Sequence, residues 1–371
     1  MRAADQMGIH YAWSMEHHFL EEYSHSSAPE VFLAAASQVT SKIRLGHGVV
    51  LALPEFNHPA RVAERIATLD LLSNGRVEFG AGEGASRMEL EGFGIDPAKK
   101  KEALDECLPE ILRMLSETPY GGFNGKSFRM PQRNVVPKPL QTPHPPLWLA
   151  CSSRESIRRA ARIGAGALTF VFSGPEETRS LVDEYYKVFK EECVPVGKAV
   201  NPNIAVVVNM FCGDDSSDRE AAQDGFDYFA YALGHYYMYG AHKPGRTQLW
   251  DLYEKAKAEG NTVKGHGIAV GTPADLRRVC ADFEASGVDQ LCFIQLVGRN
   301  THHDMLKSLE TFGSEVLPVF EARNAARDRR KKEELAPFIE KAFARVKPVP
   351  ESEPVEYPAY GWAGAKGTNK A

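Results

Sequence analysis

Two adjacent histidines and a glutamate stand near the start of this 371-residue chain, in the stretch YAWSMEHHF from Tyr11 to Phe19. Both residue types are acid–base groups, and histidine changes its charge near neutral pH. The residues before them form a short apolar run that predicts a strand. Because side chains alternate along a strand, we expect His17 and His18 to point in opposite directions, so that one can enter a pocket. A loop with two structural histidines is the alternative that this segment leaves open.

A second polar group follows the apolar run LWLAC, Leu147–Cys151. Ser152 and Ser153 stand where this predicted strand gives way to a predicted helix. Small hydroxyl side chains and free N–H groups at the start of a helix bind phosphate well. The alternative is that both serines only cap the helix.

Composition excludes several classes of partner. The chain has 44 Lys and Arg against 49 Asp and Glu, so no basic excess predicts nucleic acid or an anionic membrane as partner. We find no apolar run long enough to span a bilayer and no signal peptide. No two of the six cysteines are closer than twelve positions, and the histidines are scattered, so no metal site is predicted. Scattered cysteines fit a reducing cytoplasm, where we expect the protein to be located.

The elements that must position these residues alternate between strand and helix patterns, which predicts a parallel α/β fold. Seven strands are expected, each followed by a helix or a helix-sized segment. The strands after the first are Ile43–Val50, Arg76–Gly82, Leu147–Cys151, Gly166–Phe172, Asn203–Cys212 and Val288–Val297. The helices are Ala28–Thr40, His58–Ser73, Lys99–Glu117, 152–163, Glu176–Cys193, Pro273–Ser286 and His302–Arg323, and Gly121–Pro146 is a long connection.

Two regions fall outside this alternation. An insertion over 213–265 contains the aromatic stretch Phe226–Gly240, which predicts either core or oligomer-interface packing, or a lid over a ligand. Residues 326–371 are expected to form a charged helix and an extended tail. The tail aromatics Tyr357, Tyr360 and Trp362 are candidates for docking on a neighbouring subunit.

Several segments, taken in order, resemble the bacterial luciferase-like flavin-dependent monooxygenases. They are EHHF at Glu16–Phe19, the stretches Ala28–Val50 and Leu53–Gly82, GFGID at Gly92–Asp96, Pro146–Leu168, and GTPADL at Gly271–Leu276. The resemblance covers roughly residues 1 to 325 and rests on the order and spacing of the segments, since no single one is specific.

The resemblance implies a TIM-like (β/α)8 barrel over residues 1–325, followed by the C-terminal region 326–371. It implies monooxygenation with O2 by reduced FMN, supplied by a separate NAD(P)H-dependent flavin reductase. The aromatic insertion indicates a small hydrophobic organic substrate. A homodimer is the expected assembly.

The resemblance also assigns site residues. His17 is the implied active-site acid or base, and a non-prolyl cis peptide bond facing the flavin ring is implied between Gly48 and Val49. His47 lies beside that bulge, and Gly82 takes the place of a reactive cysteine of luciferase. These residues form the expected flavin site together with three serines that face the flavin phosphate, Ser152, Ser153 and Ser156.

Besides Gly82, two departures from the family pattern leave other hypotheses open. The chain begins about twenty-five residues later than family members do, so the first barrel strand is expected to be absent. Glu83 stands in the glycine turn where many relatives have a basic residue, and Arg87 is the nearby cation that would compensate. The alternatives are a deazaflavin-dependent hydride-transfer enzyme without O2, a non-catalytic flavin-binding partner subunit, and a metal hydrolase on the same barrel.

Overall fold

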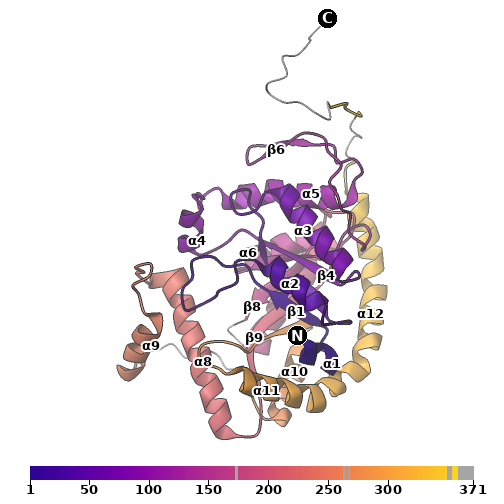
Figure 1. Ribbon diagram of the computed structural model, residues 1–371. Helices are drawn as coiled ribbons and strands as arrows, with labels where there is room; N and C mark the ends of the chain where they lie inside the picture. The colour runs from indigo at the N-terminus through magenta and orange to yellow at the C-terminus, as the bar shows by residue number, and fades with distance from the viewer. Residues whose placement is uncertain (172–173, 262–264, 266–267, 349–352, 358–371) are drawn as a thin grey trace, which may run out of the picture.

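A curled sheet of nine parallel strands forms the centre of the molecule (Figure 1). The computed structural model describes residues 1–171, 174–261, 265, 268–348 and 353–357. The strands are β1 (Tyr11–Ser14), β2 (Arg44–His47), β3 (Val50–Leu51), β4 (Val77–Gly82), β7 (Leu147–Cys151), β8 (Gly166–Phe170), β9 (Ile204–Cys212), β10 (Ala269–Gly271) and β11 (Gln290–Ile294). Their order is β1-β2-β4-β7-β8-β9-β10, with β3 beside β4 and β11 beside β9. This confirms the predicted parallel α/β class and, within the described residues, a strand in each of the seven expected places.

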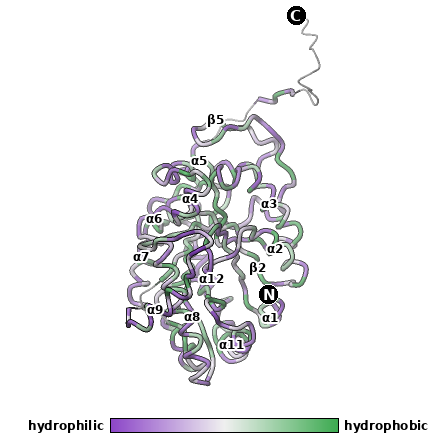
Figure 2. The backbone as a smooth tube through the Cα atoms, turned by 60° about the vertical axis from the view of Figure 1, so that its left-hand side comes forward, coloured by the Kyte–Doolittle hydropathy of each residue, from purple (hydrophilic) through white to green (hydrophobic). Residues whose placement is uncertain are grey.

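Helices surround the sheet, and the apolar parts of the chain gather at its centre (Figure 2). The helices are α1 (Arg2–Met7), α2 (Pro29–Ser37), α3 (Pro59–Leu72), α4 (Arg87–Gly92), α5 (Lys100–Ser116), α6 (Arg154–Arg162), α7 (Pro175–Glu192), α8 (Ser216–Gly234), the π-helix η1 (His235–Tyr239), α9 (Leu249–Ala258), α10 (Pro273–Ala285), α11 (His302–Glu315) and α12 (Leu317–Ala344). In β9, every residue except Asn209 is hydrophobic, and all but Val207 and Asn209 are buried, as expected of a strand covered on both faces. None of the described helices is long and apolar enough to cross a membrane.

Helix α3 shows how the sequence sets an element's limits. His58 precedes it, and its ring nitrogen accepts a hydrogen bond from the N–H of Ala60. Pro59 occupies the first helical position, where its missing N–H costs nothing. The chain turns back to β4 at Asn74 and Gly75, which both have positive φ angles, so the predicted stop is confirmed.

The sheet is open on one side in the described part of the chain, because no backbone pairing joins β11 to β1. Trp13 of β1 lies beside this gap and packs edge-on against Trp148 of β7, with ring centroids 5.5 Å apart. Across the gap, Tyr11 interacts with Gln290 of β11 through its side chain. This open side agrees with the expectation of a barrel that lacks one strand.

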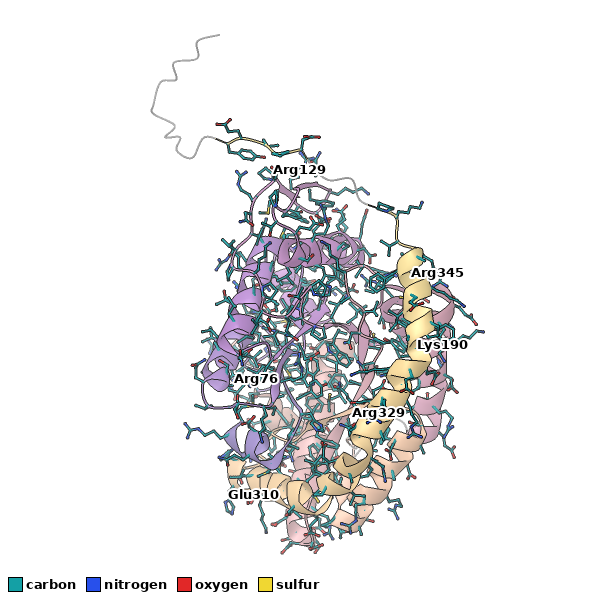
Figure 3. All side chains as sticks on the ribbon, turned by 90° about the vertical axis from the view of Figure 1, so that its right-hand side faces the viewer. Arg76, Arg129, Lys190, Glu310, Arg329 and Arg345 are labelled. Carbon is teal, nitrogen blue, oxygen red and sulfur yellow. The ribbon has the colours of Figure 1, made fainter. Side chains whose placement is uncertain are left out.

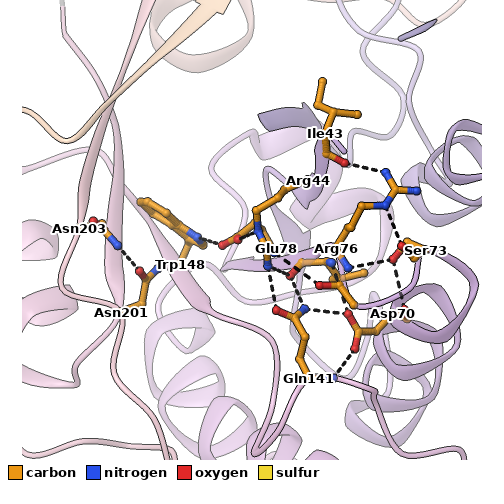
Figure 4. Close-up of polar contacts among 12 residues, drawn as sticks. Ile43, Arg44, Asp70, Ser73, Arg76, Glu78, Gln141, Trp148, Asn201 and Asn203 are labelled. Carbon is orange, nitrogen blue, oxygen red and sulfur yellow. Dashed lines mark hydrogen bonds and ion pairs between the residues drawn. The ribbon is translucent and has the colours of Figure 1, made fainter. Parts of the chain in front are cut away.

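A polar network fills the barrel near the amino ends of its strands (Figure 4). The carboxylate of Glu78 pairs with Arg44 and accepts a hydrogen bond of 2.6 Å from the Trp148 indole. Arg44 also donates to Gln141, which in turn donates to Asp70. Burial raises the pKa of Glu78, although Arg44 and Trp148 act in the opposite direction. The network therefore joins β2, β4 and β7 to the connection that precedes β7.

The last helices differ from the prediction. The expected helix His302–Arg323 is two helices, α11 and α12, which meet at Val316. The following Pro318 is tolerated because it lies in the first turn of α12. Helix α12 runs along one side of the molecule next to Lys190 of α7 (Figure 3). Its Leu335 and Ala342 are buried in the main core, so the predicted division at residue 325 falls within a packed helix.

The long connection before β7 contains a small hairpin that the sequence did not predict, β5 (Phe123–Asn124) and β6 (Arg129–Met130). The C-terminal segment 353–357 lies against this region. Gln132 donates to the carbonyl of Glu353 and accepts from the N–H of Val355, and Arg133 stacks over the Tyr357 ring at 4.1 Å. The other two tail aromatics, Tyr360 and Trp362, lie outside the described residues.

Candidate active site

Most of the site residues predicted from the sequence lie at the carboxyl ends of four strands. His17 follows β1, the Gly48–Val49 bond lies between β2 and β3, Gly82 ends β4, and Ser152 and Ser153 follow β7. Parallel strands share the edge at which they end, so their loops meet there, as in the catalytic face of α/β barrels. Helices α4, α8 and α9 lie on this side, on the left in Figure 1.

His17 is held by a buried carboxylate. Its Nδ1 lies 3.1 Å from Oε1 of Glu89 in α4, and its backbone N–H donates to the carbonyl of Ser26. The side chain of Glu89 is 1% exposed, and that of His17 is 19% exposed. A hydrogen bond to a carboxylate requires the hydrogen on Nδ1, which leaves the lone pair of Nε2 free to accept a proton. The ring of Tyr23 stands edge-on to the imidazole at 5.7 Å.

His18 points elsewhere, as predicted, although β1 has already ended at Ser14 and a loop sets the divergence. Its Nε2 lies 3.1 Å from Oε1 of Glu16. Its ring packs against Phe56 and Phe93, with centroids 6.0 and 4.9 Å away. His18 is therefore a packed residue, and His17 is the member of the pair that has a ring nitrogen available for chemistry.

The cis peptide bond expected between Gly48 and Val49 is present. Both residues are half-buried. A Cβ atom on Gly82 would lie 2.5 Å from the Val49 side chain, so the end of β4 requires glycine for the bulge to approach it. Gly82 thus fits against the bulge, and its contact with a cofactor stays a prediction.

His47 is the last residue of β2, but its ring lies against helix α3. Its ring is almost fully buried and lines a small cavity together with Glu16 and with Val62 and Ile66 of α3. Burial lowers its pKa to about 4, and the charge of Arg65 acts in the same direction. A hydrogen bond to the backbone of Glu78 acts in the opposite direction. This position, between the strands and the helix layer, supports a role in the barrel wall rather than direct contact with a cofactor.

The serines after β7 cap helix α6. The Ser153 hydroxyl accepts from the N–H of Ser156, and the Ser156 hydroxyl accepts from the N–H groups of Ser152 and Ser153, each at 3.0 Å. Ser153 thus caps α6, as the alternative predicts for this residue, and it does so together with Ser156, which the alternative did not include. The next amides, of Arg154 and Glu155, have no acceptor within the helix. Binding of a phosphate here stays a prediction.

Glu83 is neutralised, but not by the residue that the sequence indicated. Lys100 of α5 and Arg159 of α6 lie 3.6 and 3.5 Å from its carboxylate. Arg87 pairs with Glu91 on the surface of α4 and not with Glu83, and its expected compensation at the phosphate stays a prediction. The two actual cations are remote in sequence and approach Glu83 only because α5 and α6 flank β4.

The inner wall at the carboxyl edge is apolar and open. Ala150 is exposed although its neighbours in β7 are buried, and Phe170 at the end of β8 is 43% exposed. Val207 and Asn209 of β9 are partly exposed within an otherwise buried strand. Filled barrels bury such positions, so the exposed side chains at this end of the barrel are accessible to a ligand.

The insertion covers the loop that carries His17. Aromatic side chains of α8, η1 and α9 form a cluster with Leu20, namely Tyr228, Tyr236, Trp250 and Tyr253. The hydroxyl of Tyr236 donates to the carbonyl of Glu21, and Tyr23 stacks on Phe229 at 5.7 Å. The aromatic side chains pack as a core, as one alternative predicts. They also lie beside the site, as the lid alternative requires. Whether the insertion moves as a lid stays a prediction.

Sequence reasoning missed Glu89, Tyr23, Lys100 and Arg159. Glu89 did carry a signal, because it occupies a short helix directly after the glycine turn that ends β4. The other three gain their positions only from tertiary packing.

Comparisons with known proteins agree with this arrangement. A family model described as luciferase-like monooxygenase matches residues 1–290. The oxygenase component of the flavin-dependent trigonelline monooxygenase of Acinetobacter baylyi is 28% identical over 331 residues, which are 85% of this chain and 87% of that protein. Protein y4wF of Sinorhizobium fredii is 38% identical over 44% of this chain, and limonene 1,2-monooxygenase of Rhodococcus erythropolis is 32% identical over 53%. These two matches span about half the length of the relatives, 46% and 49%.

Solved structures show the same fold. The oxygenating constituent of 3,6-diketocamphane monooxygenase of Pseudomonas putida, in complex with FMN, matches with a TM-score of 0.63 at 21% identity, over 85% of this chain and 90% of that one. The coenzyme F420-dependent tetrahydromethanopterin reductase of Methanopyrus kandleri matches with a TM-score of 0.64 at 21% identity, over 86% and 93%. These likenesses confirm the predicted barrel fold.

Proposed function

This chain belongs to the luciferase-like monooxygenase family and is an oxygenase enzyme, and from that premise we propose that it uses reduced FMN and O2 to oxidise a small hydrophobic organic compound. One observation carries the proposal. The His17–Glu89 pair, the Gly48–Val49 bulge and the amino end of α6 come from separate strands and lie at one edge of the barrel.

The described residues fit a flavin at this edge. Val49, Ala150 and Phe170 offer an apolar, open wall for a planar ring system. The first amides of α6 and the Ser152 hydroxyl offer donors for a phosphate, and Arg159 and Lys100 lie at the neighbouring turn. A reduced flavin would supply two electrons and the activation of O2. The FMN of the diketocamphane monooxygenase structure supports this choice of cofactor.

The chain's own contribution is to orient, to exclude water and to handle protons. Nε2 of His17 is the ring nitrogen left for chemistry, because Nδ1 is held by Glu89. A histidine in this state can take a proton from a reacting group and return it later. The aromatic insertion lies over the same loop and would keep water away once a substrate is bound.

We also propose a flavin reductase as partner. The trigonelline enzyme is named as an oxygenase component, which supports a division of labour between two proteins. In this chain a separate NAD(P)H-dependent reductase would deliver reduced FMN.

The test combines the purified chain with FMN, NADH and a flavin reductase, and measures O2 uptake and oxygenated product. Trigonelline and limonene serve as probe substrates because they are the substrates named for two relatives. We expect substrate-stimulated O2 uptake, and we expect His17→Ala to lower turnover by about a hundredfold or more while FMN binding is kept. Normal turnover by His17→Ala would refute the assignment of His17.

Two results would favour the alternatives. Substrate oxidation by an oxidised deazaflavin, or substrate reduction by a reduced deazaflavin, without O2 uptake would identify a hydride-transfer enzyme. One structural neighbour is named as dependent on coenzyme F420. FMN binding without turnover in either assay would support a non-catalytic partner subunit.

A further inference from the structure

We propose that Glu89 is a positioning residue for His17, and that the similar Glu16–His18 pair beside it only fixes the loop. The two histidines are consecutive, and each has one ring nitrogen 3.1 Å from a buried carboxylate. The proposal rests on the proposed acid–base role of His17. It assigns different tasks to two pairs that look equivalent in the sequence.

Glu89 has few partners apart from this segment. Its Oε1 accepts from Nδ1 of His17 at 3.1 Å and from the backbone N–H of His18 at 2.8 Å. Within the described residues, no lysine or arginine forms an ion pair with it. A buried carboxylate is costly unless it is paired and hydrogen-bonded. Glu89 is therefore suited to stabilise a positive charge on His17 when that ring takes up a proton.

Glu16 has other tasks. Its Oε2 accepts from the N–H of Leu51 at 2.8 Å, and its Oε1 accepts from the side-chain amide of Asn57 at 2.8 Å, in addition to the contact with His18. It would keep two hydrogen bonds if His18 were absent. Glu16 thus connects the loop after β1 to β3 and to the turn before α3, which is a structural function.

The chemistry of the Glu89–His17 pair follows from the atoms. The Nδ1 hydrogen bond selects one tautomer and one ring orientation, as carboxylates do for catalytic histidines in general. In the described part of the chain, nothing forms a hydrogen bond to Nε2 of His17. A proton from a reacting group can therefore bind Nε2 while the Nδ1 hydrogen stays between His17 and Glu89. The same proton leaves from Nε2 when the reaction is complete.

Four variants separate positioning from structure. Glu89→Leu removes both charge and acceptor, and Glu89→Gln removes charge but keeps an acceptor. Glu16→Gln alters the second pair in the same way. Glu91→Gln changes an exposed glutamate two residues away in the same helix. Thermal unfolding of each variant is measured first, and if Glu89→Leu does not fold, Glu89→Gln carries the test.

The first readout does not depend on activity. Nitrogen-15 spectra of histidine-labelled protein report which ring nitrogen carries the hydrogen, and His17→Gln identifies the signals of His17. We expect the Nδ1–H form of His17 in the wild type, Glu16→Gln and Glu91→Gln, and a mixture of tautomers in Glu89→Leu. An Nε2–H form in the wild type, or unchanged His17 signals in Glu89→Leu, would overturn the proposal.

The second readout is kinetic. With reduced FMN, O2 and a turned-over substrate, we expect Glu89→Leu to lower kcat by roughly tenfold to a hundredfold with KM nearly unchanged. Glu89→Gln should give a smaller loss and a changed pH profile of kcat, and Glu16→Gln should lower thermal stability without changing that profile. Equal pH profiles for wild type and Glu89→Gln would contradict a positioning role.

The two proposals fail in different ways. If His17→Ala remains active while the nitrogen spectra are as expected, the proposed function of His17 is wrong although the pair exists. If the spectra show no link between Glu89 and His17 while His17→Ala is inactive, the present inference is wrong and the proposed function stands.

Discussion

Burial controls the charge of the ionisable side chains in the barrel wall. His47 is the clearest case, since it lies between the strands and α3 and its Nδ1 has no hydrogen-bond partner in the described residues. Burial lowers its pKa to about 4, well below the ordinary value near 6.5. The folded protein therefore keeps this ring neutral where the unfolded chain would protonate it.

This difference predicts a loss of stability in acid. A group whose pKa is lowered in the folded state gives stability that is complete above about pH 6.5 and is lost as the pH falls toward about 4. The shift corresponds to at most about 3 kcal/mol of unfolding free energy. We expect His47→Gln, which keeps a side-chain N–H donor but does not titrate, to flatten this part of the profile, as measured by urea unfolding at pH 7, 5.5 and 4.5.

The control for His47 is His25→Gln, because His25 is an exposed histidine in the loop that follows β1. It should leave the profile unchanged. If the unfolding free energy of His47→Gln depends on pH in the same way as that of the wild type, the lowered pKa of His47 in the folded protein is refuted.

Secondary-structure elements were predictable where their signal is local. The strand β7 is a continuous apolar run, β9 is one interrupted only at Asn209, and α3 carries both a start and a stop signal. The short strands β3 and β10 pair over two or three residues, and their existence depends on distant partners. The break between α11 and α12 does carry a local signal that the prediction did not use, because Pro318 stands two residues after Val316.

The residues of the candidate site also fall into those that local sequence predicts and those that depend on distant partners. His17 and the Gly48–Val49 bond could be predicted from the sequence because each lies within one recognisable segment. Glu89 approaches His17 across 72 positions, and Arg159 approaches Glu83 across 76. Such pairs arise from the order of strands in the barrel, which residue types alone do not determine.

The insertion is attached to the loop after β1 by two glutamates. The carbonyls of Glu21 and Glu22 accept from tyrosines of η1 and α8, and the Glu22 carboxylate accepts from the first amides of α9, at Leu249 and Trp250. Helix α9 has no side-chain hydrogen bond from its own N-cap residue, Gln248. Glu22 therefore does the work of a cap from a distant segment.

We expect Glu22→Ala to loosen the insertion. Loss of a helix cap costs about 1 kcal/mol, which is roughly a fivefold rise in the open population. Limited proteolysis within Phe226–Gly240 should accelerate by about that factor, and FMN with substrate should slow cleavage of the wild type. Glu259→Ala, at the exposed end of α9, is the matched control and should be cleaved at the wild-type rate. Equal cleavage with and without ligands would favour a fixed interface over a lid.

The whole molecule presents an apolar surface on the adjoining helices α2 and α3. Val31 and Phe32 of α2 are 66% and 55% exposed, and Leu71 and Leu72 at the end of α3 are 47% and 51% exposed. Exposed apolar groups of this kind, concentrated on neighbouring elements, mark interaction surfaces. The homodimer expected from the sequence would bury them against a second copy of the chain.

This assembly can be measured by light scattering after size exclusion. We expect a wild-type dimer, and a monomer with an unchanged circular dichroism spectrum for the double variant Phe32→Glu, Leu72→Glu. Leu296→Glu, which changes an exposed leucine after β11, should remain a dimer. A dimer that survives the double variant would place the interface elsewhere.

Helix α12 affects when the protein can complete its fold. Lys331 donates to Asn203 and Asp289, which stand immediately before β9 and β11, and Arg345 donates to the carbonyl of Cys193 after α7. These partners are synthesised more than forty residues, and in part more than one hundred, before the α12 residues that bind them. During translation, the amino ends of the later strands therefore wait uncovered until the last long helix has left the ribosome, and the nascent barrel is most exposed to misfolding in that interval.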